Sequence, residues 1–338
     1  MMRRDRDFID DAARRLKPLL EQARTVALCT HVNPDGDGIG AEICLHRHLR
    51  SIDLESRIIN TEALPLRYQF LDSAGAVEVY DAQRHAEFLR NADLIFMLDN
   101  SSVSRLGALE PAVRGSRATT ICIDHHDVVE PFWRVNIVDE EASATGELVF
   151  QIVKALGGAI DTEGAQAAYV SLVTDTGYFR FSKTSPRSHE AAAEMLALGV
   201  RPPRVYQEVY ERNSAALVRL SGVALSAVQQ DEEGTLAWIR LTHKQVLDCD
   251  AAQEDLSDVV NGLLAIDGVQ IAVMLKELGG GHIKLSFRSK EALDVNRIAA
   301  MFGGGGHRNA SGAVIPGLLA ESIEKVLAPC RELLRSNR

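Results

Sequence analysis

Cysteine is scarce in this sequence and is not arranged in pairs that would build a disulfide or zinc framework. The 338 residues include five cysteines, and none of them form a C-x-x-C motif. An odd number of scattered cysteines predicts free thiols in a reducing compartment. Cys29 and Cys122 lie inside apolar runs, where a buried thiol acts as a small hydrophobic side chain. The class of small, disulfide-stabilised secreted proteins is therefore excluded.

Long apolar segments are also missing. Residues 1–15 are charged and do not contain the apolar core of a signal peptide. No apolar run reaches the length of about 18 residues that a membrane-spanning helix needs. We therefore expect neither a secretory leader nor a membrane span, and we expect the protein to be cytoplasmic.

Positive charge is in deficit. The 37 lysines and arginines are outnumbered by 47 aspartates and glutamates, which gives a formal net charge of −10. Proteins that hold long DNA or RNA usually need a basic face, because they must neutralise many phosphates. The sequence therefore argues against a long nucleic acid as partner. A small phosphorylated ligand needs only a local basic pocket, and it remains compatible with this charge.

The first half of the chain predicts a parallel sheet. Apolar runs rich in β-forming residues cover 25–30, 54–60, 93–98 and 118–123, and helical patterns separate them. Continuous apolar strands that alternate with helices are typical of a parallel sheet covered on both faces. At about 150 residues per domain, the length favours two domains.

The second half indicates helices and then a different sheet. Helices are predicted at 143–156, with Ser143 as the cap and Glu147 as its capping-box partner, at 162–173 and at 188–198. Strands are predicted at 236–241, 269–276 and 282–288, and the last of these alternates like a half-exposed strand. We predict an α/β catalytic domain over 1–198, a linker over 199–215 and a smaller α/β domain with a mixed sheet over 216–338.

Carboxylates and histidines gather at the predicted strand ends. In chain order they are His31, Asp35, Asp37, Asp99, Asp124, His125, His126 and Asp175. One at a time, an Asp in a turn usually bonds the backbone, and a histidine near a strand end is usually an ordinary surface or core residue. Together they would meet at the edge where parallel strands have their carboxyl ends. Like charges buried there would be costly without cations.

The types of ligand favour hard divalent ions. No cysteine belongs to the group, and carboxylates with some imidazole suit Mn²⁺, with Mg²⁺ or Co²⁺ as near alternatives, better than structural zinc. Six metal ligands drawn from this group are more than one open catalytic ion needs, so we predict two ions that share a bridging carboxylate. Such pairs hydrolyse phosphate esters.

These motifs resemble the DHH phosphoesterase superfamily, whose RecJ nucleases and family II pyrophosphatases share the same motif order. The run Gly303-Gly-Gly-Gly-His307-Arg-Asn-Ala-Ser-Gly312 resembles the glycine-rich signature of the DHHA1 domain. The length and layout look most like the members that act both as oligoribonucleases (nano-RNases) and as phosphatases of 3′-phosphoadenosine 5′-phosphate (pAp). The resemblance implies a parallel-sheet domain and a DHHA1 domain with the active site in a cleft between them.

The resemblance also implies roles for single residues. His31, Asp35 and Asp99 would hold the first metal. The second would be held by Asp37, Asp99, His125 and Asp175, with Asp99 bridging. His126 would contact the scissile phosphate or assist the leaving oxygen, and Asp124 would orient the site.

Substrate binding is assigned to a second group of residues. Gly304, Gly305 and Gly306 would offer backbone N–H groups to an anion, beside His307. Arg288 suits a terminal phosphate because its guanidinium is a planar fork. Taken alone, the glycines could be a plain flexible loop and Arg288 a solvated charge. Arg180 and Lys183 are weaker phosphate-binding candidates, and Arg105 is weaker still.

A recognition site close to the metals would limit substrate length. We therefore predict RNAs of about two to five nucleotides as substrates, hydrolysed to 5′-mononucleotides, together with pAp. One alternative is a phosphodiesterase of cyclic di-AMP or pApA. A non-catalytic nucleotide sensor is disfavoured because every ligand is present, and a pyrophosphatase because its second domain carries a different signature. A homodimer is compatible with the sequence.

Overall fold

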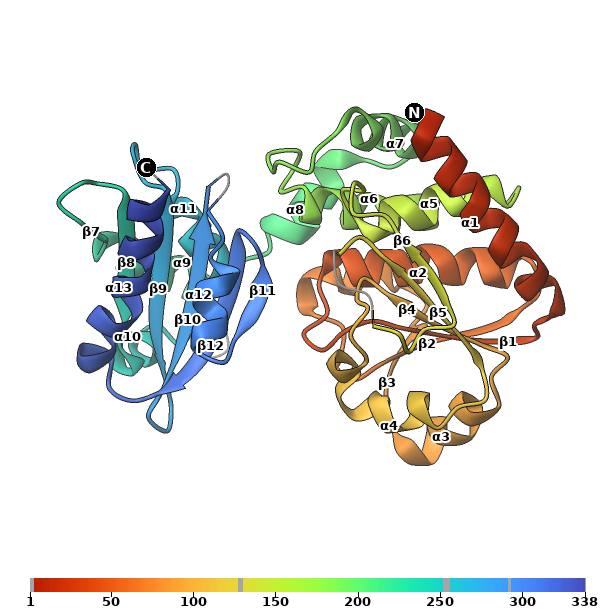
Figure 1. Ribbon diagram of the computed structural model, residues 1–338, viewed down its shortest axis with the longest axis horizontal. Coiled ribbons are helices and arrows are strands. Elements are labelled where there is room, and N and C mark those ends of the chain that lie inside the picture. Colours follow the sequence, from red (N-terminus) through yellow and green to blue (C-terminus); the bar gives the residue numbers. More distant parts are fainter. Residues whose placement is uncertain (1–2, 127–129, 252–255, 291–292, 338) are drawn as a thin grey trace. The chain divides into compact units, whose positions relative to one another are not determined.

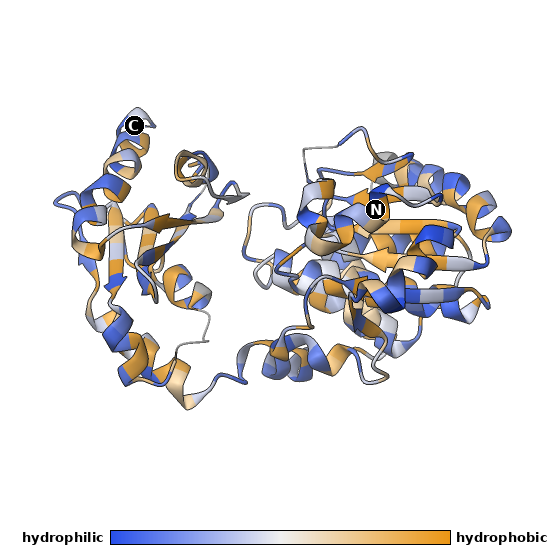
Figure 2. Ribbon diagram, turned by 90° about the horizontal axis from the view of Figure 1, so that it is seen from below, coloured by the Kyte–Doolittle hydropathy of each residue, from blue (hydrophilic) through white to orange (hydrophobic). Residues whose placement is uncertain are grey.

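The computed structural model describes residues 3–126, 130–251, 256–290 and 293–337 (Figure 1). The chain divides into two compact units, Met1–Arg212 and Asn213–Arg338. Each unit has a sheet and a hydrophobic core of its own. Figure 2 shows apolar residues concentrated along the strands of the first unit and polar residues on the outer turns of its helices. No helix in the described ranges has the length and apolar character needed to span a membrane.

The first unit contains the predicted parallel sheet, which has six strands: the four predicted ones and, in addition, β3 and β6. The strands are β1 (Thr25–Cys29), β2 (Glu55–Asn60), β3 (Val77–Val79), β4 (Leu94–Leu98), β5 (Thr119–Asp124) and β6 (Val135–Val138). Their order is β3-β2-β1-β4-β5-β6. The chain builds outward from β1 to β3, then returns to place β4 on the other side of β1. Ligands of such sheets bind at this switch point, beyond the carboxyl ends of the strands.

Helices cover both faces of this sheet (Figure 1). They are α1 (Arg3–Gln22), α2 (Gly36–Ser51), α3 (Ala82–Asn91), α4 (Glu110–Arg114), α5 (Thr145–Ala155), α6 (Thr162–Asp175), α7 (Pro186–Ala197) and α8 (Pro202–Tyr210), with two short 3₁₀ segments, η1 (Leu66–Leu71) and η2 (Val103–Leu109). Val26 and Leu28 belong to the core under α2 and α5. Ala27 and Cys29 point to the opposite core, under α3 and α4. Both faces of β1 are therefore buried, which explains its uninterrupted apolar sequence.

The second unit has the predicted mixed sheet. Its strands are β7 (Gln229–Gln230), β8 (Leu236–Leu241), β9 (Ile271–Leu278), β10 (His282–Ser289), β11 (Gly305–His307) and β12 (Ala310–Pro316). The order is β11-β12-β10-β9-β8-β7, in which β8 and β9 are parallel and the other neighbours antiparallel. The helices are α9 (Ala215–Ser226), α10 (His243–Asp248), α11 (Ser257–Leu263), α12 (Asn296–Met301) and α13 (Leu319–Ser336).

Two local predictions need correction, and the range predicted as a linker needs a fuller description. The half-exposed character of β10 holds at His282 and Lys284, whereas Ser286 is buried, because α11 packs on β9 and β10. Ser143 is not a helix cap: α5 begins at Thr145 after Ala144, and no side chain caps it. The Ser143 hydroxyl instead donates to the Lys183 carbonyl at 2.7 Å. The range predicted as a linker, 199–215, contains α8.

One buried carboxyl of the first unit lies outside the strand-end group. Glu42 on α2 is fully buried, and its Oε2 accepts a hydrogen bond from Asn60 Nδ2 at 2.8 Å. Asn60 Oδ1 in turn accepts from the Thr30 backbone N–H at 3.0 Å. Burial raises the pKa of Glu42 to about 8, although the bond from Asn60 opposes the rise. The folded protein therefore keeps the Glu42 proton at neutral pH.

We expect Glu42→Gln to flatten the pH dependence of stability. A group whose pKa is higher in the folded than in the unfolded state stabilises the fold at low pH, and this contribution is lost as pH rises toward about 8. Removing the group should raise the free energy of unfolding by about 2 to 4 kcal/mol at pH 8 and by little at pH 5. Urea unfolding at both pH values measures this, with the exposed Glu55→Gln as control. Equal pH slopes for wild type and Glu42→Gln would contradict the assignment.

Candidate metal centre

The turn between β1 and α2 gives Asp35 two tasks. Asp35 is the N-cap of α2, and its Oδ1 accepts hydrogen bonds from the backbone N–H groups of Asp37 and Gly38 at 3.0 and 3.3 Å. Its other oxygen, Oδ2, lies 3.9 Å from His31 Nε2. One oxygen of Asp35 thus makes the backbone hydrogen bonds usual for an aspartate in a turn. The other faces His31, in the cluster that the sequence predicted.

The glycines of this turn are needed for close packing rather than for an unusual backbone. A Cβ at Gly36 would lie 2.5 Å from Thr174 Oγ1, and one at Gly38 would lie 2.2 Å from Thr30 Oγ1. Neither glycine has a positive φ. Their absent side chains let α2 approach β1 and the end of α6, which carries Asp175.

Asp99 stands at the centre of the cluster and faces both histidines. Its Oδ2 lies 3.5 Å from His31 Nε2, and its Oδ1 lies 3.5 Å from His125 Nε2. His125 Nε2 is also 3.5 Å from Asp37 Oδ2 and 3.3 Å from Asp175 Oδ2. The structure thus brings all six predicted ligands together in overlapping sets: His31, Asp35 and Asp99; Asp37, His125 and Asp175; and a further set of Asp99, His125 and His126.

The backbone at Asp99 is strained. Asp99 follows β4 at the switch point with a φ of 61°, a left-handed conformation that costs a non-glycine residue about 1–2 kcal/mol. Its N–H donates to the Ile123 carbonyl of β5 at 3.1 Å, which holds the turn in place. The strain places the carboxylate between the two histidines.

The electrostatics of the cluster call for positive charge. Burial, followed by repulsion from Asp37 and Asp35, raises the pKa of both Asp99 and Asp175 well above the usual range. Burial lowers the pKa of His31 and His125, so these rings favour the neutral form. Neutral imidazoles do not compensate the carboxylates. A bound cation would.

The histidines are oriented as metal ligands are. His125 Nδ1 lies 3.2 Å from the Ala142 carbonyl and His31 Nδ1 lies 2.8 Å from the Val32 carbonyl, so each Nδ1–H can donate. Each Nε2 then directs its lone pair at the carboxylates, the arrangement that a backbone acceptor imposes on a ligating histidine. His125 Nε2 has no hydrogen-bond partner in the described part of the chain. Oxygen and imidazole donors of this kind fit a hard divalent ion.

Asp124 and His126 form a linked pair beside this group. Asp124 Oδ1 accepts from His126 Nδ1 at 2.6 Å and from the His125 backbone N–H at 2.7 Å. Burial is the largest single effect on Asp124 and would raise its pKa, but the hydrogen bond from His126, the charges of His126 and His125 and the bond from the His125 N–H together lower the pKa. His126 Nδ1 also lies 3.8 Å from Asp99 Oδ1. Asp124 therefore orients His126 at the edge of the cluster.

The start of α5 is a part of the site that the sequence did not reveal. The backbone N–H groups of Thr145 and Gly146 donate to the two oxygens of Asp37 at 2.8 and 2.9 Å. Thr145 Oγ1 donates to Asp99 Oδ1 at 3.2 Å, and Ser171 Oγ donates to Asp37 Oδ1. A helix N-terminus favours a carboxylate in this position. The sequence offered one signal for this part of the site, a predicted helix that starts soon after a strand of the sheet.

Basic side chains border the cluster. Lys183 Nζ donates to the His125 carbonyl at 3.0 Å. Arg187, which is buried, pairs with Asp139 at 2.6 Å and with Glu147 at 2.7 Å, and so anchors the segment that leads into α5. Arg105, the weakest sequence candidate, has Nη2 3.0 Å from His31 Nδ1. Arg180 is exposed in the loop after Asp175.

The remaining candidates belong to the second unit. Arg288 on β10 donates through Nε to Asn261 Oδ1 at 2.9 Å. A Cβ at Gly304 would lie 2.0 Å from the Gly312 carbonyl oxygen, and one at Gly306 would lie 2.6 Å from that of Ala310. These two glycines therefore permit the tight β11–β12 hairpin, whereas Gly305 has more space. His307 pairs through its backbone with Ala310, and its side chain is outside the described part.

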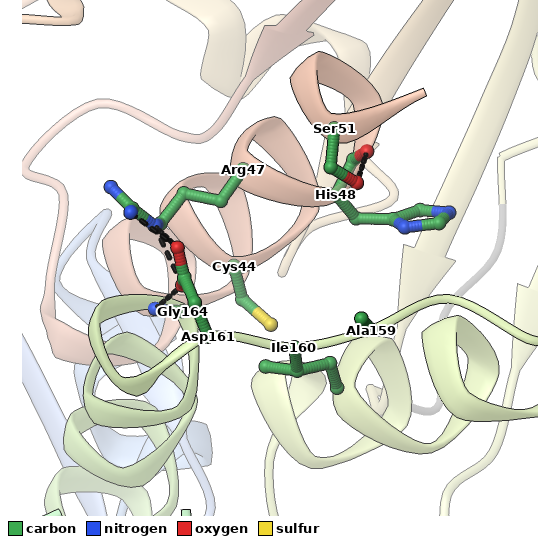
Figure 3. A pocket seen from close by; sticks show the side chains of 8 residues that line it. All are labelled: Cys44, Arg47, His48, Ser51, Ala159, Ile160, Asp161 and Gly164. Carbon is green, nitrogen blue, oxygen red and sulfur yellow. Dashed lines mark hydrogen bonds and ion pairs between the residues drawn. The ribbon is translucent and has the colours of Figure 1, made fainter.

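A pocket of the first unit lies apart from the cluster, between α2 and the start of α6 (Figure 3). Its charged groups satisfy one another: Arg47 pairs with Asp161 and Glu163. Burial raises the pKa of Cys44 to about 12, so its thiol stays protonated. The lining contains one histidine, His48, and one carboxylate, Asp161, whereas the cluster gathers several of each.

Comparisons with known proteins identify the family of this chain. The model of the DHH family, N-terminal domain, matches residues 25–175, and that of the DHHA1 domain matches residues 239–336. The chain is 32% identical over 310 residues to the bifunctional oligoribonuclease and PAP phosphatase NrnA of Thermus thermophilus, covering 91% of this chain and 90% of that protein. It is 26% identical to the Bacillus subtilis protein of the same name, and the match covers 93% of this chain and 96% of that protein. A crystal structure of an exopolyphosphatase-related protein from Bacteroides fragilis superposes with a TM-score of 0.91 and 31% identity, and the match covers 96% of this chain and 98% of that one.

We expect Asp99→Asn to stabilise the metal-free protein and to remove its response to metal. The change deletes one of several buried like charges, so the free energy of unfolding in chelator should rise by about 1–3 kcal/mol. A ligand that binds only the folded state raises the melting temperature, and Mn²⁺ should do so for wild type but much less for the variant. Thermal unfolding with chelator and with Mn²⁺ tests both parts. A wild type indifferent to divalent ions would contradict the metal centre.

Thr145→Val should weaken metal binding without unfolding the protein. The substitution removes the hydroxyl that donates to Asp99, and loss of such a supporting bond typically costs about 10-fold in metal affinity. Titration with Mn²⁺ monitored by calorimetry measures the change. Thr162→Val is the matched control, because its hydroxyl donates to the Leu198 carbonyl instead. Equal affinities in the two variants would show that Thr145 does not support the site.

Proposed function

Because the chain belongs to the DHH family and carries a DHHA1 domain, we propose that it is a metal-dependent phosphoesterase that hydrolyses very short RNA to 5′-mononucleotides and removes the 3′-phosphate of pAp. The observation that carries the proposal is the placing of Asp99 between His31 and His125, with one oxygen toward each. The names of the relatives from Thermus thermophilus and Bacillus subtilis support the two substrates.

The cluster would hold two divalent ions. His31, Asp35 and Asp99 would hold one, and Asp37, Asp99, His125 and Asp175 the other. Mn²⁺ suits these donors, with Mg²⁺ and Co²⁺ as alternatives. When bound, such ions supply Lewis acidity, which lowers the pKa of water and offsets the charge of the phosphate.

The protein's own groups would handle the substrate's proton and charge. Asp124 holds His126 through Nδ1–H, which leaves Nε2 to contact the scissile phosphate or to give a proton to the leaving oxygen. Asp37 is held by the N-terminus of α5 and by Ser171, so it does not need to reorganise during turnover. Arg105, beside His31, would attract a phosphate.

Recognition of the nucleotide would involve the second unit. We assign Arg288 and the backbone N–H groups of Gly304, Gly305 and Gly306 to phosphate binding, together with His307, and Arg180 of the first unit to the same task. The net charge of −10 supports a short substrate, because a long polymer would meet repulsion beyond the local basic groups. We further propose that the protein acts in the cytoplasm and that it assembles as a homodimer.

A substrate panel tests the proposal. With Mn²⁺ present, we expect an RNA dinucleotide to be cleaved at least about 10-fold faster than a 24-mer, and pAp to yield AMP and phosphate. The same preparation should be tested on pApA and cyclic di-AMP, because the same metal chemistry could act on them. Equal rates on the 24-mer and the dinucleotide would overturn the preference for short RNA.

Asp99→Ala is the matched inactive variant for this panel. Loss of the shared carboxylate should lower kcat by about 10³-fold or more on every substrate, because both ions depend on it. Circular dichroism should show that the fold persists. Unchanged turnover in a folded Asp99→Ala protein would contradict the bridging role.

A further inference from the structure

The loop between α6 and α7 presents an aromatic ring, Phe181, that the proposed chemistry does not yet use, beside the phosphate-binding candidate Arg180. Phe181 is a large apolar side chain with 45% of its surface exposed. The guanidinium carbon of Arg180 lies 5.1 Å from the centre of the Phe181 ring. Arg180 itself is exposed. A single exposed phenylalanine is common in proteins, so the surroundings must decide whether this one has a role.

The loop has a defined and strained conformation. Gly177, Tyr178 and Phe179 follow one another with φ values of 55°, 57° and 64°, and the last two carry side chains that disfavour this region. The Thr176 carbonyl accepts hydrogen bonds from the N–H groups of both Arg180 and Phe181 at 2.9 Å. The Phe179 ring stacks on His189, with the ring centres 4.7 Å apart. Strain of this kind persists where the surroundings fix it, and it is concentrated at functional sites.

Both ends of the loop are attached to the metal centre. At the first end, Thr176 follows the ligand Asp175, and the Phe181 ring lies so close to Gly177 that a Cβ there would be 2.6 Å from it. At the other end, Lys183 donates to the carbonyl of the ligand His125 at 3.0 Å. Ser143 Oγ, two residues before Thr145, donates to the Lys183 carbonyl at 2.7 Å. The loop that carries Phe181 therefore begins and ends beside residues of the cluster.

The chemistry of this pair fits a nucleotide better than a plain phosphate ester. Aromatic rings stack on the faces of unpaired bases without regard to sequence, and each stack is worth about 1–3 kcal/mol. Single-stranded RNA is commonly recognised by such stacking. A guanidinium next to the ring can contact the phosphate that accompanies the base. The ring would contribute little to the binding of pyrophosphate or of another substrate without a base.

We propose that Phe181 and Arg180 form a base-stacking subsite, in which the ring takes the base next to the scissile phosphate and the guanidinium contacts a phosphate of the same nucleotide. This inference rests on the proposed function and adds what distinguishes its substrates. The subsite selects for a base of any identity. It requires that base to be unpaired, so that its face is available to the ring.

The test pairs matched variants with matched substrates. Phe181→Leu keeps apolar bulk but removes the π face, whereas Phe181→Trp keeps a ring. The substrates are an RNA dinucleotide and the same dinucleotide made abasic at one position or the other, all with Mn²⁺. Phe181→Leu should lower kcat/KM for the intact dinucleotide by about 10- to 100-fold, mainly through KM. Phe181→Leu should not change the rate on one of the two abasic substrates, the one that lacks the stacked base. The kcat/KM of Phe181→Trp for the intact dinucleotide should stay within about 3-fold of the wild-type value.

The outcomes separate this inference from the proposed function. If wild type does not cleave the dinucleotide at all, the proposed function fails, and the subsite with it. If wild type cleaves it and Phe181→Leu has no effect, the subsite alone is wrong. If Phe181→Leu slows the intact and both abasic substrates equally, the ring supports the loop rather than a base, and the subsite is again overturned.

Discussion

The constraint on which this structure depends is the crowding of like charge at one edge of a parallel sheet. Asp35, Asp37, Asp99 and Asp175 converge where β1 and β4 end, and burial raises the pKa of Asp99 and Asp175 well above the usual range. A protein can tolerate such a group only if cations or strong donors oppose it. The surrounding backbone supplies several of those donors. The N–H groups at the N-terminus of α5 donate to the Asp37 carboxylate, and the Asp37 N–H donates to the Asp35 carboxylate.

This arrangement explains the tight packing of the helices around it. The α2 helix lies against α6 without Cβ atoms at Gly36 and Gly40, because Thr174 and the Ala167 carbonyl occupy that space. Gly146 at the start of α5 is likewise in contact with Ser171. The three helices that deliver or hold the carboxylates therefore meet closely, and small residues at the meeting points set how near the carboxylates can come.

The sequence was informative where a signal is local. Strand β8 could be placed at its observed bounds because apolar residues lie between turn signals. Six candidate ligands could be listed because each lies at the end of a strand or in a glycine turn, and the structure brings them together. The supporting residues could not be predicted, because their partners are remote in the chain. Thr145 and Ser171 reach Asp37 across 108 and 134 residues. Ser143 has a local pattern typical of a cap, but a distant carbonyl competes for its hydroxyl.

The two carboxylate oxygens of Asp35 have different contacts, and this affects which residues related chains can lose during evolution. One oxygen begins helix α2 and the other faces His31, so the residue is needed by the fold as well as by the cluster. Asp175 has no comparable structural duty, because it is the last residue of α6 and the helix is capped at its other end by Asp161. A descendant relieved of catalysis should therefore discard Asp175 early and retain Asp35. A surviving aspartate at the start of α2 is consequently poor evidence of activity, whereas one at the end of α6 is good evidence.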